Sequence, residues 1–218
     1  MKLYKAIALL LTYPEQDWLQ SIGELRAVVS AETGRGLRAG RRLDRLLTYF
    51  EHGRLIDLQE AYVETFDRNP AHSLSIFEHA MGESRDRGAA MVRLVEEYHR
   101  SGLEVTSREL PDFLPVFLEF LSLIPPEEAQ GRLADIEDVV ETLHSRLTEI
   151  CSPYAGAFDA LMVLSPGSAW SGASSPIRNM RRLLRPTQSE TRVGMPGTLT
   201  KEPPGDGGHR ETRHDPSR

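Results

Sequence analysis

Two Glu-x-x-His pairs are the residues of this 218-residue sequence whose types and spacing best suit metal chemistry. The first pair is Glu96 with His99, and the second is Glu141 with His144. Inside helical bundles, such pairs combine with further glutamates to hold a carboxylate-bridged di-iron centre. The spacing therefore raises the hypothesis of a di-iron or other metal-binding redox protein.

The position of each glutamate on its predicted helix argues against that hypothesis. At 100° per residue, Glu96 falls roughly 150° from the apolar face of residues 84–100. By the same measure, Glu141 falls about 140° from the apolar stripe of residues 126–150. A metal centre in the core of a bundle needs ligands that point inward. The redox protein is therefore kept only as the alternative function.

Other catalytic signatures are missing. The sequence has no Gly-x-Ser-x-Gly motif, no His-Glu-x-x-His motif and no glycine-rich phosphate loop. Its one cysteine, Cys151, excludes an internal disulfide and a Cys-based zinc or iron–sulfur site. Nothing marks Cys151 as an activated thiolate, so we expect a small buried hydrophobic residue.

Five arginines between residues 35 and 45 form a basic run. Segments that bind nucleic acid combine such charge with aromatic residues, and this run has none. The first 164 residues carry 17 Lys or Arg against 27 Asp or Glu, a net charge of −10. We therefore expect a solvated helix face here and no nucleic-acid partner.

Nearly all of the first 164 residues follow the apolar period of helices. The predicted helices span residues 2–13, 15–31, 40–52, 55–67, 73–81, 84–100, 111–124, 126–150 and 153–164. No stretch alternates with the period of a strand. The sequence predicts an all-α, single-domain bundle of about eight to nine helices over residues 1–164.

The last 54 residues, 165–218, differ in composition. They contain seven Pro and seven Gly and have a net charge of +4. Few apolar residues follow Leu184, so this stretch cannot bury enough surface to offset the entropy of ordering it. We expect a disordered tail with at most a short helical turn near residues 177–184.

The apolar runs of the sequence are too short for a membrane span. The longest covers residues 6–11, far below the roughly 18 residues that a spanning helix needs. It ends at Tyr13-Pro14-Glu15 without the small-residue cleavage site of a secretory signal. Together with the single cysteine, this favours a reduced, cytoplasmic protein without stable membrane insertion.

The predicted helix near residues 110–124 is apolar around most of its circumference, and only Asp112 and Glu119 interrupt it. Such a helix must be covered on several sides. It is either the central helix of the bundle or, in part, the wall of a groove that awaits an apolar partner helix. Both hold if neighbouring helices cover one side and a client covers the other.

Three stretches carry a resemblance to a known family. They read YVETFDRN at 62–69, SLSIFEHAMGESRDRGAAMVRLVEEYHRSGLE at 73–104 and ELPDFLPVFLEFLS at 109–122. They resemble the respiratory nitrate reductase assembly chaperone, or delta subunit, within the twin-arginine-signal proofreading chaperones of molybdoenzymes. The resemblance covers roughly residues 1–164 and implies an all-helical single domain without enzymatic activity.

The resemblance also implies a client and a role. The chaperone would bind the N-terminal segment of the catalytic (alpha) subunit of nitrate reductase while molybdenum cofactor and iron–sulfur cluster are installed. It would hold no cofactor stably itself, and it would not be part of the finished membrane enzyme. An acidic body with an apolar groove is what a basic, amphipathic segment requires.

The predicted peptide-binding site combines the family motifs with the apolar helix. The Pro-Asp-His motif of the wider family matches Pro111, Asp112 and Phe113, where Phe replaces His. The other motif positions are Tyr62, Asp67, Glu78 and His79, and the helix adds Phe117, Glu119 and Leu121. Capping is the ordinary role of an aspartate at a helix start, and a hydrogen-bonded structural role is the default for a histidine.

Overall fold

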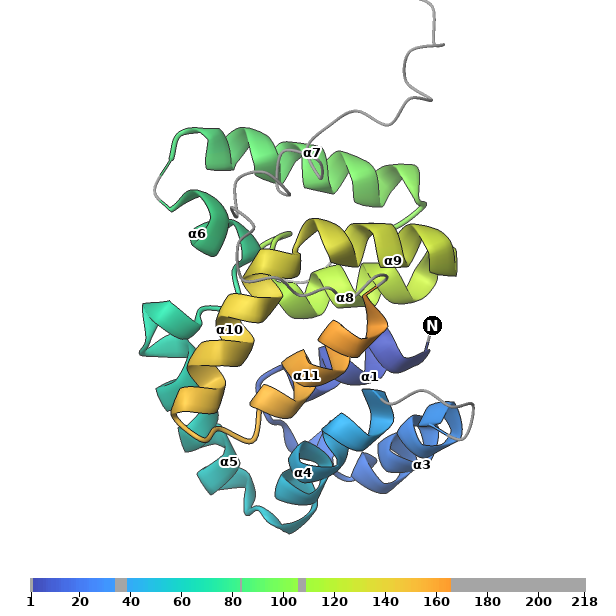
Figure 1. Cartoon of the computed structure of the whole chain (residues 1–218), viewed down its shortest axis with the longest axis vertical. Coiled ribbons are helices and arrows are strands. Elements are labelled where there is room, and N and C mark those ends of the chain that lie inside the picture. The colour runs from blue at the N-terminus through green and yellow to red at the C-terminus, as the bar shows by residue number, and fades with distance from the viewer. Residues whose placement is uncertain (1, 34–38, 83, 106–108, 166–218) are drawn as a thin grey trace, which may run out of the picture. The chain divides into compact units, whose positions relative to one another are not determined.

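The computed structural model describes residues 2–33, 39–82, 84–105 and 109–165 (Figure 1). Apart from Ser165, the predicted tail lies outside these residues. The described chain is helical and contains one isolated β-bridge, between Ser75 and Phe113. The prediction of an all-α fold is confirmed.

Eleven α-helices lie in the described residues. They are α1 (Lys2–Leu10), α2 (Gln16–Leu19), α3 (Ile22–Thr33), α4 (Ala39–His52), α5 (Leu55–Tyr62), α6 (Ile76–Met81), α7 (Asp86–Arg100), α8 (Leu114–Leu123), α9 (Pro126–Asp135), α10 (Glu137–Glu149) and α11 (Ala155–Leu164). A π-helical turn, η1 (Val63–Asp67), continues α5, and a 3₁₀ turn, η2 (Pro70–His72), follows it. No helix among the described residues has both the length and the apolar character to cross a bilayer.

The helix count exceeds the prediction because two predicted helices are each divided. Residues 126–150 form α9 and α10, which run in different directions in Figure 1. The division is at Ile136, whose backbone leaves the helical region at φ −110° and ψ 14°. Glu137 and Asp138 then occupy the first turn of α10, where the helix dipole favours acidic side chains. One non-helical residue hardly disturbs the apolar stripe, so the spacing alone conceals the break.

The core is built around α8 and α11. The helix α8 packs against α1 and α9, while α11 packs against α4 and α10. Tyr154, just before α11, is surrounded by aromatic rings: its centroid lies 4.8 Å from that of Phe66, 5.9 Å from Phe50 and 6.2 Å from Tyr62. These edge-on contacts join the start of α11 to α4, α5 and η1.

The crossing of α11 over α4 occurs at a glycine. A Cβ atom on Gly156 would lie 2.5 Å from the backbone oxygen of Arg42, which is closer than real Cβ atoms come to other atoms. Only glycine therefore allows the two helix backbones to approach this closely.

The turn after α10 corrects the expectation for Cys151, which is exposed. Its backbone is left-handed, with φ 54°. Its N–H donates to the oxygen of Thr148 and the N–H of Ser152 donates to that of Leu147, both at 2.9 Å. This is the Schellman helix end, which normally places glycine where Cys151 lies. The end of α7 has the same two hydrogen bonds around Gly102, at φ 75°.

Candidate peptide-binding site

Asp112 is fully buried and caps a helix other than the one that follows it. Its Oδ2 accepts a hydrogen bond from the N–H of Phe77 at 3.0 Å, and its backbone oxygen accepts one from Ile76 at 2.9 Å. Both donors belong to the first turn of α6, whose own preceding residue, Ser75, provides no side-chain cap. The segment before α8 therefore satisfies the open N-terminus of α6.

The charge of Asp112 is only partly compensated. Burial raises the pKa of its carboxyl, while the Phe77 amide and the Arg87 guanidinium, 3.7 Å from Oδ2, act in the opposite direction. Its Oδ1 has no hydrogen-bond partner within the described residues. Next to it, the oxygen of Pro111 accepts a hydrogen bond from the hydroxyl of Tyr98 at 2.8 Å. Pro111 and Asp112 thus fix the start of α8 to both α6 and α7.

Glu78 and His79 fold the preceding loop onto α6. The hydroxyl of Ser73 donates to Glu78 Oε2 at 2.6 Å, and the Nε2 of His79 donates to the backbone oxygen of Ser73, also at 2.6 Å. Burial lowers the pKa of His79, and the bond to Ser73 partly opposes that shift. Both side chains are half-buried and serve this loop.

The first family motif surrounds the π-helical turn. Tyr62 is buried, and its hydroxyl donates to the backbone oxygen of Leu11 at 3.1 Å. In η1, the N–H of Arg68 donates to the oxygen of Val63 at 3.0 Å, which spans five residues. Such turns are rare in proteins overall, and those that occur often lie at functional sites. Asp67, the last residue of η1, is exposed.

The structure places the predicted residues of α8 on different faces. Phe117 and Leu121 are fully buried in the core, so a client cannot touch them while α8 stays packed. Glu119 is exposed and lies 3.5 Å from Lys5. Phe113 is half-buried, and its backbone forms the isolated β-bridge with Ser75.

A groove nevertheless opens along another face of α8, and we call it the α8 groove. It has a volume of about 280 Å³ and is lined by Tyr98, Leu103, Glu104, Val105, Val116, Glu119, Phe120 and Leu123. Most of its lining is apolar, and two glutamates belong to it. Leu103 and Val105, which sequence reasoning missed, follow the glycine that ends α7. An apolar pair directly after a predicted helix end is the signal that would have identified them.

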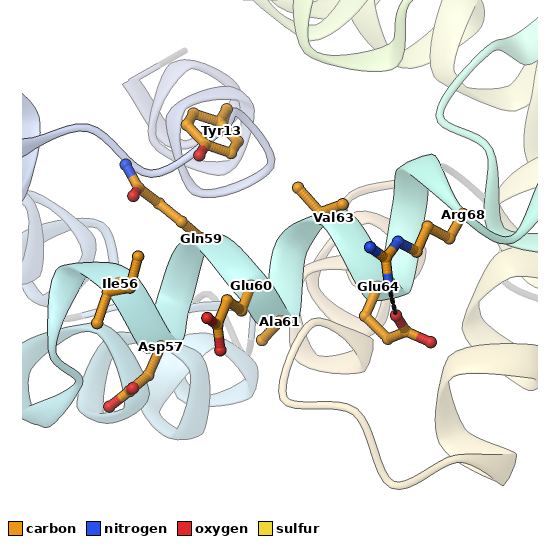
Figure 2. Close-up of a pocket in the computed structure, with 9 residues that line it drawn as sticks. All are labelled: Tyr13, Ile56, Asp57, Gln59, Glu60, Ala61, Val63, Glu64 and Arg68. Atoms are coloured by element: carbon orange, nitrogen blue, oxygen red, sulfur yellow. Dashed lines mark hydrogen bonds and ion pairs between the residues drawn. The ribbon is translucent and has the colours of Figure 1, made fainter.

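A second groove, the α5 groove, follows the outer side of α5 and η1 (Figure 2). It has a volume of about 690 Å³ and is lined by Tyr13, Ile56, Asp57, Gln59, Glu60, Ala61, Val63, Glu64 and Arg68. The side chain of Gln59 donates to the oxygen of Pro14 at 2.8 Å, which holds the segment after α1 against α5. Sequence reasoning missed this groove because its walls come from two separate segments.

The α5 groove has an apolar side and an acidic side. In Figure 2, Ile56 and Val63 point toward the side of α5 where Tyr13 lies, whereas Asp57 and Glu60 point to the opposite side. Asp57 accepts hydrogen bonds from Arg54 at 2.6 and 2.7 Å. The carboxylate of Glu60 has no hydrogen-bond or salt-bridge partner among the described residues.

The two Glu-x-x-His pairs do not assemble a site. Glu96 and His99 are exposed, and Nε2 of His144 lies 3.4 Å from Asp159. The neighbouring Glu97 is buried instead, in an ion pair with Arg132 of α9. Within the described residues, no three His, Cys, Asp or Glu side chains lie together in a way that suits a metal ion.

Comparisons with known proteins agree with the three motifs. The sequence model of the family described as "Nitrate reductase delta subunit" matches residues 36–160. The chain is 38% identical over 178 residues to the probable nitrate reductase molybdenum cofactor assembly chaperone NarW of Escherichia coli K12, covering 80% of this chain and 72% of that one. It is 40% identical over 159 residues to the assembly chaperone NarJ of the same strain, covering 73% and 67%. A probable NarJ of Bacillus subtilis is 31% identical over 162 residues, covering 73% and 85%. The chain belongs to the nitrate reductase delta subunit family.

Proposed function

We propose that this protein is a molybdenum cofactor assembly chaperone for a nitrate reductase and has no enzymatic activity of its own. Its similarity to proteins named as nitrate reductase molybdenum cofactor assembly chaperones supports this role. Its client is the catalytic subunit of the enzyme, which it holds by the N-terminal segment until the cofactor has been inserted. The cofactor is cargo for the client, and the chaperone binds none stably. The protein acts in the cytoplasm and is not part of the finished membrane enzyme.

The client segment binds as an amphipathic helix in the α8 groove. Its apolar face packs on Leu103, Val116 and Leu123, and its basic residues pair with Glu104 and Glu119. Burying two leucines and an aromatic ring contributes several kcal/mol at about 25 cal/mol per Å². Ordering the segment offsets part of this gain. The affinity then lies between micromolar and nanomolar, or about −8 to −12 kcal/mol.

The remaining motif residues support the groove rather than line it. Phe117 and Leu121 anchor α8 in the core, while Pro111 and Asp112 fix its first turn. Phe113 lies half-buried at that turn. Further away, Glu78 and His79 keep α6 folded against the same segment, and Tyr62 and Asp67 belong to the α5 side of the molecule. The family motifs therefore lie mainly on residues that support the site, and less on residues that a client would contact.

One observation carries the proposal: an apolar edge of α8 is open to solvent beside two carboxylates. Leu123 is 59% exposed at this edge, so a change there leaves the core intact. Leu123→Asp should weaken binding of a synthetic client N-terminal peptide about tenfold or more, equivalent to about 1.4 kcal/mol, in titration calorimetry. Val92→Asp is the matched control, since Val92 is also 59% exposed and does not line the groove. A folded Leu123→Asp protein with unchanged affinity would refute the α8 groove as the binding site.

A further inference from the structure

The two carboxylates of the α8 groove differ in what surrounds them. Glu119 lies 3.5 Å from the ammonium group of Lys5 in α1, and both side chains are exposed. Glu104 is also exposed, but its carboxylate has no hydrogen-bond or salt-bridge partner among the described residues. The groove therefore contains one carboxylate that a cation already neutralises and one that is open to an incoming cation.

The same two carboxylates lie at opposite edges of the apolar surface of the groove. At 100° per residue, Glu119 falls at one edge of the apolar pair Val116 and Leu123. Phe120 falls at the other edge, and its ring centroid lies 4.8 Å from that of Tyr98 in α7. The edge near Phe120 thus faces the end of α7, where the open carboxylate lies, and the neutralised carboxylate lies at the edge away from α7.

A basic residue of the client gains more at Glu104 than at Glu119. To pair with Glu119 it must displace Lys5, which exchanges one exposed ion pair for another and changes the free energy little. Lys5 also repels a cation that approaches this edge. At Glu104 an ion pair forms where none existed, and the bound client helix shields it from water and salt.

We propose that Glu104 determines the specificity of the α8 groove. It selects an amphipathic client helix with a lysine or arginine at the edge of the apolar stripe that faces the end of α7. Lys5 keeps Glu119 paired, so the opposite edge discriminates weakly between basic and neutral residues. This inference rests on the proposed function, because the client segment is the ligand that the groove selects.

Titration calorimetry of the full-length protein with a synthetic client N-terminal peptide compares the two carboxylates. Glu104→Gln should weaken binding about fivefold at low salt, because it removes the charge and preserves the shape of the side chain. Glu119→Gln is the matched control, since Glu119 is also an exposed carboxylate of the groove, and it should weaken binding less than about twofold. Equal losses in the two variants, or unchanged affinity in Glu104→Gln, would overturn the inference.

Two further measurements separate the charge of Glu104 from any structural role. At 0.5 M salt the difference between Glu104→Gln and the unaltered protein should fall below about twofold, because salt screens the lost ion pair. Glu104→Asp retains the charge and should keep most of the affinity. A loss that persists at high salt, or an equal loss in Glu104→Asp, would overturn recognition by charge.

Lys5→Met tests the opposite edge of the groove. It keeps an apolar side chain and frees Glu119, so it should strengthen peptide binding about twofold to threefold. Adding Glu119→Gln should return the affinity to about that of the unaltered protein, because neither edge residue then carries a charge. An affinity of Lys5→Met no greater than that of the unaltered protein would overturn the role of Lys5.

Leu123→Asp distinguishes failure of this inference from failure of the proposed function. If Leu123→Asp weakens binding and Glu104→Gln does not, the groove binds the client but Glu104 does not determine its specificity. If neither substitution weakens binding, the α8 groove is not the client site, and both proposals are wrong.

Discussion

Cys151 occupies a backbone position that favours glycine, and this makes it a site for stabilisation. A left-handed backbone costs about 1–2 kcal/mol for a residue with a Cβ atom. Arg45 donates a hydrogen bond to the Cys151 backbone oxygen at 3.2 Å, and a glycine would keep that contact. Cys151→Gly should therefore raise the free energy of unfolding by about 1 kcal/mol in urea titrations.

Cys151→Ala is the control for this prediction. It removes the thiol and keeps a Cβ atom, so it should not produce a comparable gain. A loss of stability in Cys151→Gly would show that the thiol contributes more than the backbone strain costs. The sequence could not reveal this strain, because the apolar character of cysteine carries no information about φ.

Asp112 should make the protein less stable as the pH rises from acid to neutral. Burial holds the pKa of its carboxyl above the usual range. Between the usual and the raised pKa, the native state binds more protons than the unfolded state, so this group lowers stability with rising pH. Asp112→Asn keeps an oxygen for the Phe77 amide and removes the charge.

The stability of Asp112→Asn relative to wild type should thus be more favourable at pH 7 than at pH 4, as measured by urea unfolding at each pH. Any amide hydrogen of the new side chain that lacks a partner lowers the stability equally at both pH values. A pH-independent effect of Asp112→Asn would mean that the buried carboxylate is fully compensated.

At the scale of elements, the contact between α4 and α11 depends on Gly156. Gly156→Ala should lower the free energy of unfolding by about 1–3 kcal/mol, because the helix backbones must move apart. Gly131→Ala in α9 is the matched control. No atom lies within 4 Å of a Cβ added there, so the change should stabilise the helix by about 0.5–1 kcal/mol. Equal effects of the two alanines in thermal unfolding would contradict the close crossing.

Helical periodicity located the helices of the described chain but not the open face of α8. Phe117 and Val116 are both apolar neighbours on that helix, and the sequence gives no reason to prefer either as a contact residue. The tertiary packing of α8 decides that Phe117 is buried and that Val116 borders a groove. Likewise, Asp112 could be predicted as a cap, but not as the cap of α6, because that pairing depends on tertiary structure.

At the scale of the whole molecule, the charge distribution should govern how fast a basic client segment associates. Residues 1–164 have a net charge of −10, and screening by salt weakens such long-range attraction. Stopped-flow measurements with a client peptide should show the association rate falling about tenfold between low salt and 0.5 M salt. The dissociation rate, set by apolar burial, should change less. A salt-independent association rate would exclude steering and leave the groove itself unaffected.

The family could be recognised from sequence because its motifs fall on residues that join one helix or loop of the fold to another. Tyr62, Asp112 and His79 each hydrogen-bond to a distant or neighbouring backbone group, and such roles tolerate few alternatives. The two grooves could not be predicted in the same way. Each is assembled from two separate segments of the chain, and its lining residues are of ordinary apolar, polar and charged types.

The cap that Asp112 provides to α6 has a consequence for the order in which the protein can be built. The Asp112 carboxylate accepts its hydrogen bond from the N–H of Phe77, which lies 35 residues earlier in the chain. A helix of six residues is too short to persist alone in water. During synthesis on the ribosome, α6 therefore lacks this cap until Asp112 has left the exit tunnel.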